Sequence, residues 1–484
     1  MSTSTLQSRS APHRPPNFCS SLPSQLALLI IYDVFFHPLA GIPGPFWAKV
    51  TDLWHARQMA TGVRHKLLYR LHQKYGPLVR LGPNTVSVDT VEGLNKIFSA
   101  TAPIDKSPFY QSFTPGFKSS FSSTGSVFKE KKSILAQAFS QKKLDAMESS
   151  FMHHTNTLCR VLKTDKEAEL DESLSAFTID ILSDVCFGES FDLLHHPEEK
   201  KNITRGTLWR WPILQKTLRA FSHKFSRRDY PAHRAIGAMI KQKQKPSGRE
   251  DIFNYLLSAT QRATGRPFPD SEMFGEAIVL FVAGSDTTST SLLTILWHLM
   301  SDKRAYDALA NEIRSNFKSI DEINYQEAQH LPYLRAVIEE GLRILPPNSG
   351  FIPRQVMPHD TPFTLHDRVL PVGTEIGVAN LALHRNPLYF SDPDDFVPER
   401  WIKDGKIVKA GNAAFSPFSK GPRSCLGRTM AYMEMTLVLA ALFLELDIEF
   451  KDPEAEAKHG FGARDAFVLV RPMVNVIVKP RGEE

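Results

Sequence analysis

The amino-acid sequence predicts a mainly α-helical fold with small β-sheets (α+β), built as a single large domain. Most of the chain carries apolar residues at helical spacing, whereas only three stretches alternate between apolar and polar residues as strands do. At roughly 150 residues per domain, the chain of 484 residues would make about three domains. No linker, repeat or low-complexity stretch interrupts it after residue 37, so one large domain is favoured.

The predicted helices are the segments with apolar residues at helical spacing, followed by an apolar helical run near the C-terminus. They cover residues 64–75, 129–163, 173–187, 206–243, 249–262, 271–300, 302–317 and 332–344, and then Arg428 to Leu446.

Three stretches predict strands. Residues 77–89 alternate around a Gly-Pro-Asn turn and predict a β-hairpin. Residues 352–380 predict several short strands, and residues 466–480 predict a terminal hairpin.

The N-terminus differs from the rest of the chain. Residues 1–25 are rich in Ser and Pro and are predicted to be disordered. Residues 26–36 are apolar but shorter than the about 20 residues that a transmembrane helix needs. A Pro- and Gly-rich hinge, residues 37–45, opens the expected domain at 37–484. Residues 26–36 are therefore either a membrane-associated segment or the start of a core-docking helix.

Composition excludes several classes of protein. Hydrophobic residues make up 42% and charged residues 23%, as in globular chains. The net charge of +6 is mildly basic without the clustering that nucleic-acid binding needs, so no nucleic-acid partner is expected. The four cysteines, Cys19, Cys159, Cys186 and Cys425, include no CxxC pair, which argues against disulfides and structural zinc.

The sharpest local pattern is the loop Phe418 to Gly427, which places Cys425 directly before an apolar helical run. The N-terminus of a helix favours a thiolate over a thiol. Gly427 permits close approach of a flat group, and Arg423 is placed to hold an anion beside the cysteine. A lone buried cysteine is more often inert, but this pattern favours a thiolate that binds the metal of an inserted cofactor.

The segment Glu276 to Ser291 changes abruptly from apolar residues to hydroxyls and Asp286. One interpretation is a single helix that opens beside Gly284 and leaves a groove for a small ligand. The other is that Gly284 ends one helix and Ser285 or Asp286 caps the next.

Two further patterns are ordinary when taken alone. Glu340 and Arg343 lie three residues apart near the end of the predicted helix 332–344, and Pro398-Glu-Arg-Trp401 follows downstream. Most such pairs lie on protein surfaces.

Together and in this order, the AGSDTT helix, ExxR, PERW and FxxGxRxCxG resemble the cytochrome P450 superfamily of haem-thiolate monooxygenases. The resemblance covers about His37 to the C-terminus. The hinge at 37–45 and the segment Thr178 to Gly188 are similar to those of fungal members of the microsomal class.

The resemblance implies haem b as cofactor, with Cys425 as the proximal thiolate ligand of its iron. Arg423 and Arg354 are implied to pair with the haem propionates. Phe418 is implied to pack against the ligand loop, and backbone N–H groups after Cys425, towards Gly427, to temper the sulfur.

The same resemblance assigns five other residues. Glu340, Arg343 and Arg400 are implied to form a buried ion triad that braces the cysteine loop and is needed for haem incorporation. Asp286 and Thr287 match an acid–alcohol pair that delivers protons during dioxygen reduction.

The chain departs from the family at one haem contact. Where the family usually has Trp-x-x-x-Arg, this chain has Phe128 and Lys132. Lys132 supplies the charge without a fork of donors, and it remains a predicted propionate contact.

The implied activity is insertion of one oxygen atom of O2 into a hydrophobic small molecule, in fungal secondary metabolism. Electrons are expected from a separate NADPH-cytochrome P450 reductase, since the chain has no GxGxxG motif, P-loop or flavin domain. Residues 109–121 match a family loop over the distal pocket and predict an apolar, aromatic cavity.

Alternatives are a small-aromatic hydroxylase, a haem-thiolate isomerase or dehydratase that does not use O2, and a haem sensor. The expected location is the cytosolic face of the endoplasmic-reticulum membrane, with peripheral or anchored contact. The basic stretch 205–249 lies either on that membrane or on a solvated helix face.

Overall fold

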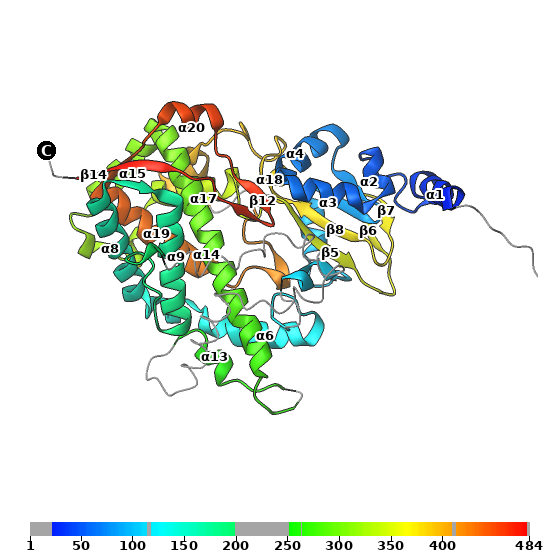
Figure 1. The fold of residues 1–484 in the computed structure, drawn as a ribbon, viewed down its shortest axis with the longest axis horizontal. Helices are drawn as coiled ribbons and strands as arrows, with labels where there is room; N and C mark the ends of the chain where they lie inside the picture. The colour runs from blue at the N-terminus through cyan, green and yellow to red at the C-terminus, as the bar shows by residue number, and fades with distance from the viewer. Residues whose placement is uncertain (1–21, 114–117, 199–250, 263, 409–412, 482–484) are drawn as a thin grey trace, which may run out of the picture.

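The computed structural model describes residues 22–113, 118–198, 251–262, 264–408 and 413–481 (Figure 1). Helices gathered around the long helix α14 (Asp270–Ser301) form the larger part of the molecule. A smaller part holds a β-sheet, with α2, α3 and α4 packed against strand β1. The prediction of a mainly helical fold with small sheets is confirmed.

Most predicted helices are present close to the expected bounds, namely α4 (Arg64–Tyr75), α9 (Leu170–Phe187), α14, α15 (Lys303–Asn316), α17 (Pro332–Ile344) and α19 (Arg428–Glu445). Helices α9 and α19 are apolar on nearly every side and bury most of their residues, as helices at the centre of a large core do. Helix α14 packs along α9, and both contribute to the same core.

Two helix predictions are wrong in extent. Residues 129–163 belong to three helices, α6 (Gly125–Ala138), α7 (Gln141–Asp145) and α8 (Glu148–Asp165). Ser140 causes the first break, because its backbone is extended and its hydroxyl donates to the Gln137 carbonyl at the end of α6.

The second wrong prediction is 249–262, where the described residues form only the single turn α13 (Asn254–Leu257). The predicted helix 206–243 lies outside the described residues.

The main sheet has the strand order β1-β2-β8-β5-β3. The predicted hairpin is confirmed as β1 and β2, and residues 352–380 form the predicted short strands. The strands of these stretches are β1 (Leu78–Gly82), β2 (Thr85–Val88), β5 (Phe351–Val356), β6 (Phe363–Leu365), β7 (Arg368–Leu370) and β8 (Glu375–Ala379). The sheet also includes β3 (Ile104–Lys106), which the sequence did not predict.

The predicted terminal hairpin is wrong. Strand β13 (Val468–Val470) pairs with β12 (Arg464–Ala466). Strand β14 (Asn475–Pro480) joins another sheet, between β11 (Leu446–Phe450) and β4 (Glu167–Glu169). The reason is burial: Val476 and Val478 of β14 are buried in the main helical core.

The remaining elements are short. They are α2 (Phe46–Val50), α3 (Asp52–Thr61), α5 (Val91–Ile97), α16 (Tyr325–Ala328), α18 (Asn380–His384), α20 (Pro453–His459), η2 (Pro108–Ser112), η5 (Ile320–Glu322), η6 (Pro398–Trp401), η7 (Gly421–Arg423), β9 (Ile402–Lys403) and β10 (Lys406–Ile407).

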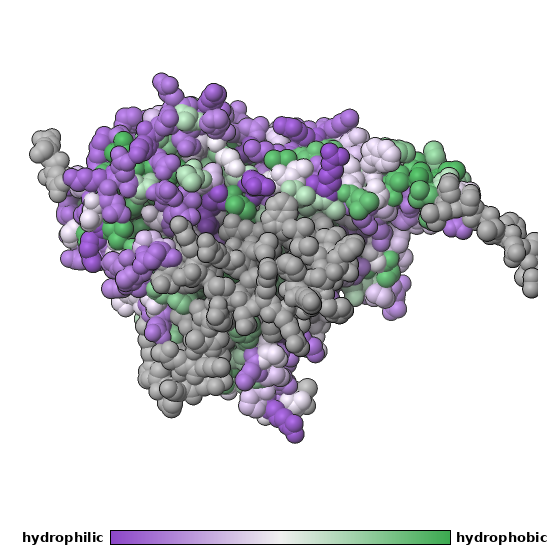
Figure 2. Space-filling model, in the orientation of Figure 1, coloured by the Kyte–Doolittle hydropathy of each residue, from purple (hydrophilic) through white to green (hydrophobic). Residues whose placement is uncertain are grey.

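The N-terminal segment does not dock on the core. Helix α1 (Leu22–Ile31) continues into the π-helical turn η1 (Tyr32–Phe36), and no side chain of residues 26–36 is buried. Figure 2 shows hydrophobic surface where α1 and α2 lie. By length and composition, α14 is the one described helix that could cross a membrane, but most of its apolar window is buried.

Candidate functional site

The loop before α19 holds Cys425 in a fixed turn. The Cys425 N–H donates to the Phe418 carbonyl at 2.9 Å, and the Phe418 ring packs on Tyr432 of α19. Gly421 has a φ of +67°, and a Cβ there would lie 1.8 Å from the carbonyl oxygen of Phe98. Glycine is therefore required where the loop passes this carbonyl.

The Cys425 side chain is exposed, whereas Cys159 and Cys186 are buried. Burial by surrounding protein raises the pKa of the Cys425 thiol, and the Gly427 N–H and the positive charges nearby oppose this increase. A bound metal ion deprotonates a coordinating thiol outright.

Arg354 is a buried cation without a carboxylate partner among the described residues. It is 4% exposed, and its guanidinium donates to the Tyr110 hydroxyl at 2.6 Å and to the Pro353 carbonyl at 2.9 Å. Burying a charge without a counter-charge is costly. The site is therefore built to receive an anion.

Two further cations lie beside Arg354. Lys106 is its cross-strand partner in the β3–β5 pair, and burial followed by repulsion from Arg354 and Arg423 holds the pKa of Lys106 well below its usual value. Arg423 pairs with Asp105 and donates to the Ser123 carbonyl at 2.9 Å. Lys106 was missed in the sequence because it belongs to no motif, and only the strand register brings it to Arg354.

Lys132 lies against the cysteine loop. Its ammonium donates to the carbonyls of Pro422 and Ser424 and so braces the loop. The ring of Phe128, which replaces the usual tryptophan, lies 3.4 Å from the Arg423 guanidinium carbon and makes a cation–π contact.

A flat dianionic cofactor with a thiolate-binding metal fits these residues. Haem presents two propionates and an iron, and the chain offers a cluster of cations and an exposed thiol. The predicted propionate contacts Arg354 and Arg423 lie in one cluster with Lys106, as their mutual electrostatic effects show.

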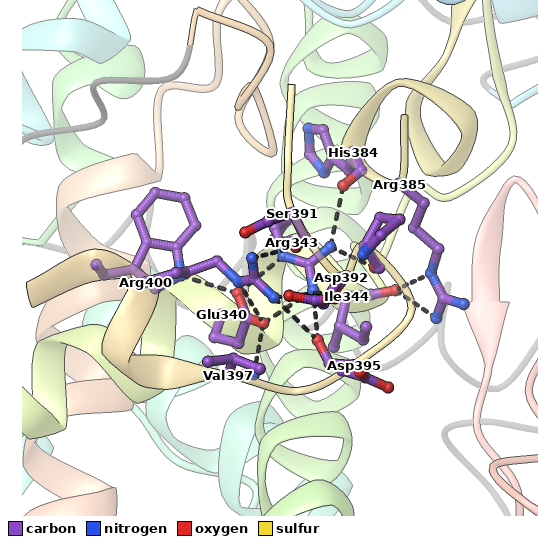
Figure 3. Close-up of polar contacts among 12 residues, drawn as sticks. Glu340, Arg343, Ile344, His384, Arg385, Ser391, Asp392, Asp395, Val397 and Arg400 are labelled. Atoms are coloured by element: carbon purple, nitrogen blue, oxygen red, sulfur yellow. Dashed lines mark hydrogen bonds and ion pairs between the residues drawn. The ribbon is translucent and has the colours of Figure 1, made fainter. Parts of the chain in front are cut away.

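The predicted ion triad forms, with Glu340 and Arg343 buried and Arg400 partly buried (Figure 3). Both Glu340 carboxylate oxygens accept from Arg343 at 2.8 Å, and one of them also accepts from Arg400 at 3.0 Å. The Val397 N–H and the Trp401 indole add donors at 2.8 and 2.9 Å. Glu340 and Arg343 are both 0% exposed, so this pair is part of the core rather than a surface pair.

A chain of hydrogen bonds runs from the triad to the cysteine loop. Arg343 donates to the His384 carbonyl at 3.1 Å, and the His384 ring accepts the Ser416 N–H at 3.0 Å. Burial, assisted by the Arg343 charge, lowers the pKa of His384 to about 3, so its ring stays neutral and able to accept. Ser416 lies two residues before Phe418, whose carbonyl holds Cys425.

Helix α14 is continuous through its polar segment, so the interpretation of two helices meeting at Gly284 is wrong. Hydroxyls at Ser285, Thr287 and Ser289 donate to carbonyls four residues earlier. A Cβ at Gly284 would lie 2.7 Å from Leu182, so this glycine permits close packing on α9.

The α14 face that carries Thr287 opens onto accessible space. Ala283, one turn before Thr287, is exposed although the helix is otherwise mostly buried. Asp286, the other predicted proton-delivery residue, lies 3.6 Å from the Arg471 guanidinium.

An aromatic cluster joins the loop after β3 to the β12–β13 turn. Phe467 at the turn contacts Phe109 and Phe113, with ring centroids 5.6 and 4.9 Å apart, and Phe121 at 6.3 Å. Phe467 adopts a φ of +80°, which is costly for a bulky side chain. Of the predicted loop 109–121, residues 114–117 lie outside the described residues.

The fold and the cysteine site together define a haem-thiolate protein, and comparison with known proteins identifies the family. The model of the cytochrome P450 family matches residues 42–471. The chain is 31% identical over 473 residues to the cytochrome P450 monooxygenase poxM of Penicillium oxalicum, covering 91% of each chain. It is 33% identical to the cytochrome P450 monooxygenase BOT4 of Botryotinia fuckeliana, covering 87% of this chain and 83% of the relative. It is 29% identical to a trichothecene C-15 hydroxylase of Fusarium sporotrichioides, covering 94% and 96%.

The chain therefore belongs to the cytochrome P450 family and is a haem-thiolate monooxygenase. Its cofactor is haem bound through a cysteine thiolate. The alternative of an isomerase or dehydratase that does not use O2 is not favoured by these relatives.

Proposed function

We propose that this monooxygenase hydroxylates an apolar small molecule of fungal secondary metabolism, with Cys425 as the iron ligand. The observation that carries the proposal is the exposed Cys425 thiol in a braced loop, together with the buried Arg354, which has no carboxylate partner among the described residues. When bound, haem held through the Cys425 thiolate would supply dioxygen activation.

The residues of the chain bind and orient the cofactor. Arg354, Arg423 and Lys106 would hold the propionates, while Phe418 and the Gly427 N–H would support the cysteine. Lys132 fixes the loop through its two carbonyl contacts and contributes positive charge near the propionates. The Glu340 triad keeps this frame rigid.

Thr287 and Asp286 take part in proton delivery. A hydroxyl can donate one hydrogen bond while it accepts another, which suits a relay inside a site that excludes bulk water. The Thr287 hydroxyl donates to the Ala283 carbonyl at 2.7 Å, and the exposure of Ala283 places this donor beside accessible space. A small rotation of the Thr287 hydroxyl away from the Ala283 carbonyl would let it pass a proton on.

The substrate is apolar and makes contact with aromatic rings. Support comes from the cluster of Phe109, Phe113, Phe121 and Phe467, and from the relative named as a hydroxylase of a trichothecene. A small aromatic substrate is the second candidate, since the same rings would stack on it.

Electrons are supplied by NADPH-cytochrome P450 reductase at the cytosolic face of the endoplasmic reticulum. The exposed apolar side chains of residues 26–36, continued by Phe46 and Trp47, support attachment to this membrane. Arg428, exposed beside the cysteine loop, offers positive charge to an acidic reductase surface.

The test is a pair of cysteine substitutions. Cys425→Ser is expected to abolish the red-shifted Soret band of the reduced carbonyl complex, whereas the buried Cys159→Ser is expected to keep it. If Cys425→Ser kept the band, another residue would be the iron ligand and the assignment would fail.

A further inference from the structure

Arg471 contacts the polar turn of α14 that carries the proposed proton-delivery residues. It lies in the segment between β13 and β14, and its side chain is 10% exposed. One guanidinium nitrogen, Nη1, lies 2.5 Å from the Ser289 hydroxyl and 3.4 Å from the Thr290 hydroxyl. The same nitrogen lies 3.3 Å from the Asp286 carbonyl and 3.6 Å from the Asp286 carboxylate.

These contacts restrict where the Asp286 carboxylate lies. The Ser289 and Thr290 hydroxyls already donate to α14 carbonyls, so their oxygens are oriented to accept from Arg471. The Arg471 guanidinium is therefore held by two hydroxyls that are themselves fixed to the α14 backbone. Its charge then attracts the Asp286 carboxylate to one side of the helix.

The same short hairpin reaches the aromatic cluster. Its turn carries Phe467, which packs on Phe113, and the carbonyl of Leu469 on β13 lies 3.4 Å from the Thr290 hydroxyl. Arg471 follows β13 directly. The hairpin thus links the proposed substrate-contacting rings to the acidic residue on α14.

We propose that Arg471 is a positioning residue that holds the Asp286 carboxylate where it relays protons toward Thr287. This inference rests on the proposed proton-delivery role of Asp286 and Thr287. Without substrate, electrons from NADPH reduce dioxygen either to hydrogen peroxide, with two electrons and two protons, or to two waters, with four electrons and four protons. Poor proton delivery favours peroxide, so the peroxide fraction reports on the position of Asp286.

The experiment uses the holoenzyme with its reductase and NADPH, without added substrate. NADPH, dioxygen and hydrogen peroxide are measured for wild type, Arg471→Met, Arg471→Lys, Asp286→Asn and the Asp286→Asn/Arg471→Met double variant. Arg471→Met is expected to raise the ratio of peroxide to water about fivefold, the scale of one partly exposed ion pair. Arg471→Lys keeps the cation, so its ratio of peroxide to water is expected to lie close to that of wild type.

The double variant separates positioning from general damage. If Arg471 acts through Asp286, Arg471→Met adds no further change in the Asp286→Asn background. Arg314→Met is the matched control, because Arg314 also pairs with an aspartate, Asp447, and with backbone carbonyls, but on α15 away from this turn. It is expected to leave the ratio unchanged.

Two readouts do not depend on turnover. The reduced carbonyl spectrum is expected to show equal haem loading in all variants. Hydrogen–deuterium exchange is expected to be faster over residues 283–291 in Arg471→Met than in wild type or Arg471→Lys. If Arg471→Met does not load haem, Arg471→Gln takes its place in every comparison.

Three outcomes overturn the proposal. An unchanged ratio in Arg471→Met, with a changed ratio in Asp286→Asn, overturns the role of Arg471 alone. An equal effect of Arg471→Met in both backgrounds shows that it does not act through Asp286. No effect of Asp286→Asn overturns the proton-delivery role of Asp286 and the present inference with it.

Discussion

Replacing Glu340 by glutamine tests whether the buried triad carries the cysteine loop. In Glu340→Gln one charged acceptor becomes an NH2 group that faces the N–H donors of Arg343, and the Arg343 charge stays buried. Removing one partner of such a buried pair costs about 3–5 kcal/mol. The Val397 N–H and Trp401 indole also lose an ionised acceptor. We therefore expect destabilisation near the middle of this range.

The assay combines haem content with urea unfolding. Glu340→Gln is expected to be recovered with little bound haem and an unfolding free energy lower by about 4 kcal/mol. Glu449→Gln is the control, because Glu449 pairs with Lys479 at a site where both side chains are more than half exposed. Exposed pairs contribute at most about 1 kcal/mol. A Glu340→Gln protein with full haem loading, within about 1 kcal/mol of wild type, would refute the reasoning.

Three further predictions follow from the site and the surface. Thr287→Ala is expected to keep its haem and to release more hydrogen peroxide, while the product formed per NADPH oxidised falls by at least about 100-fold. An unchanged yield of product per NADPH would mean that Thr287 only packs the helix. The protein is expected to sediment with endoplasmic-reticulum membranes and to be partly released by high salt or carbonate, and deletion of residues 22–36 is expected to increase the released fraction; full solubility of the intact chain would contradict this. His384 takes up a proton at pH 6.5 when unfolded but only near 3 when folded, so its stabilising contribution is complete above 6.5 and decreases as the pH falls. Between pH 7 and pH 5, the free energy of unfolding measured with urea is therefore expected to fall by about 2 kcal/mol less in His384→Gln than in wild type. An equal fall in both proteins would show that His384 does not titrate in this way.

Local signals predicted much of the fold. Helices such as α4 and α17 have strong apolar periodicity and uninterrupted backbones, and their bounds agree with the prediction. The break at Ser140 was missed because serine is tolerated within helices, although its hydroxyl can donate to a nearby carbonyl and end the helix, as it does here. The pairing of β14 with β11 was missed because strands of alternating residues carry no information about distant partners.

The candidate site shows the same limit. Cys425, Glu340 and Arg400 were found because motifs mark them in the sequence. Lys106 and Arg471 were not found, since each depends on a contact between segments distant in sequence: β3 with β5, and the C-terminal hairpin with α14. Such contacts have no signal in a single sequence.

The cations Arg354, Arg423 and Lys106 have a consequence for the amount of this protein in a cell. Without an anionic ligand they repel one another, so the ligand-free chain lies closer to its unfolding threshold than the loaded one. A ligand that binds only the folded chain adds about 1.4 kcal/mol of stability for each tenfold rise in its free concentration above Kd. Unfolded molecules are removed by proteases, and changes of 1–2 kcal/mol alter abundance severalfold. We therefore expect the amount of this chain that accumulates to rise with haem supply, at a fixed rate of synthesis.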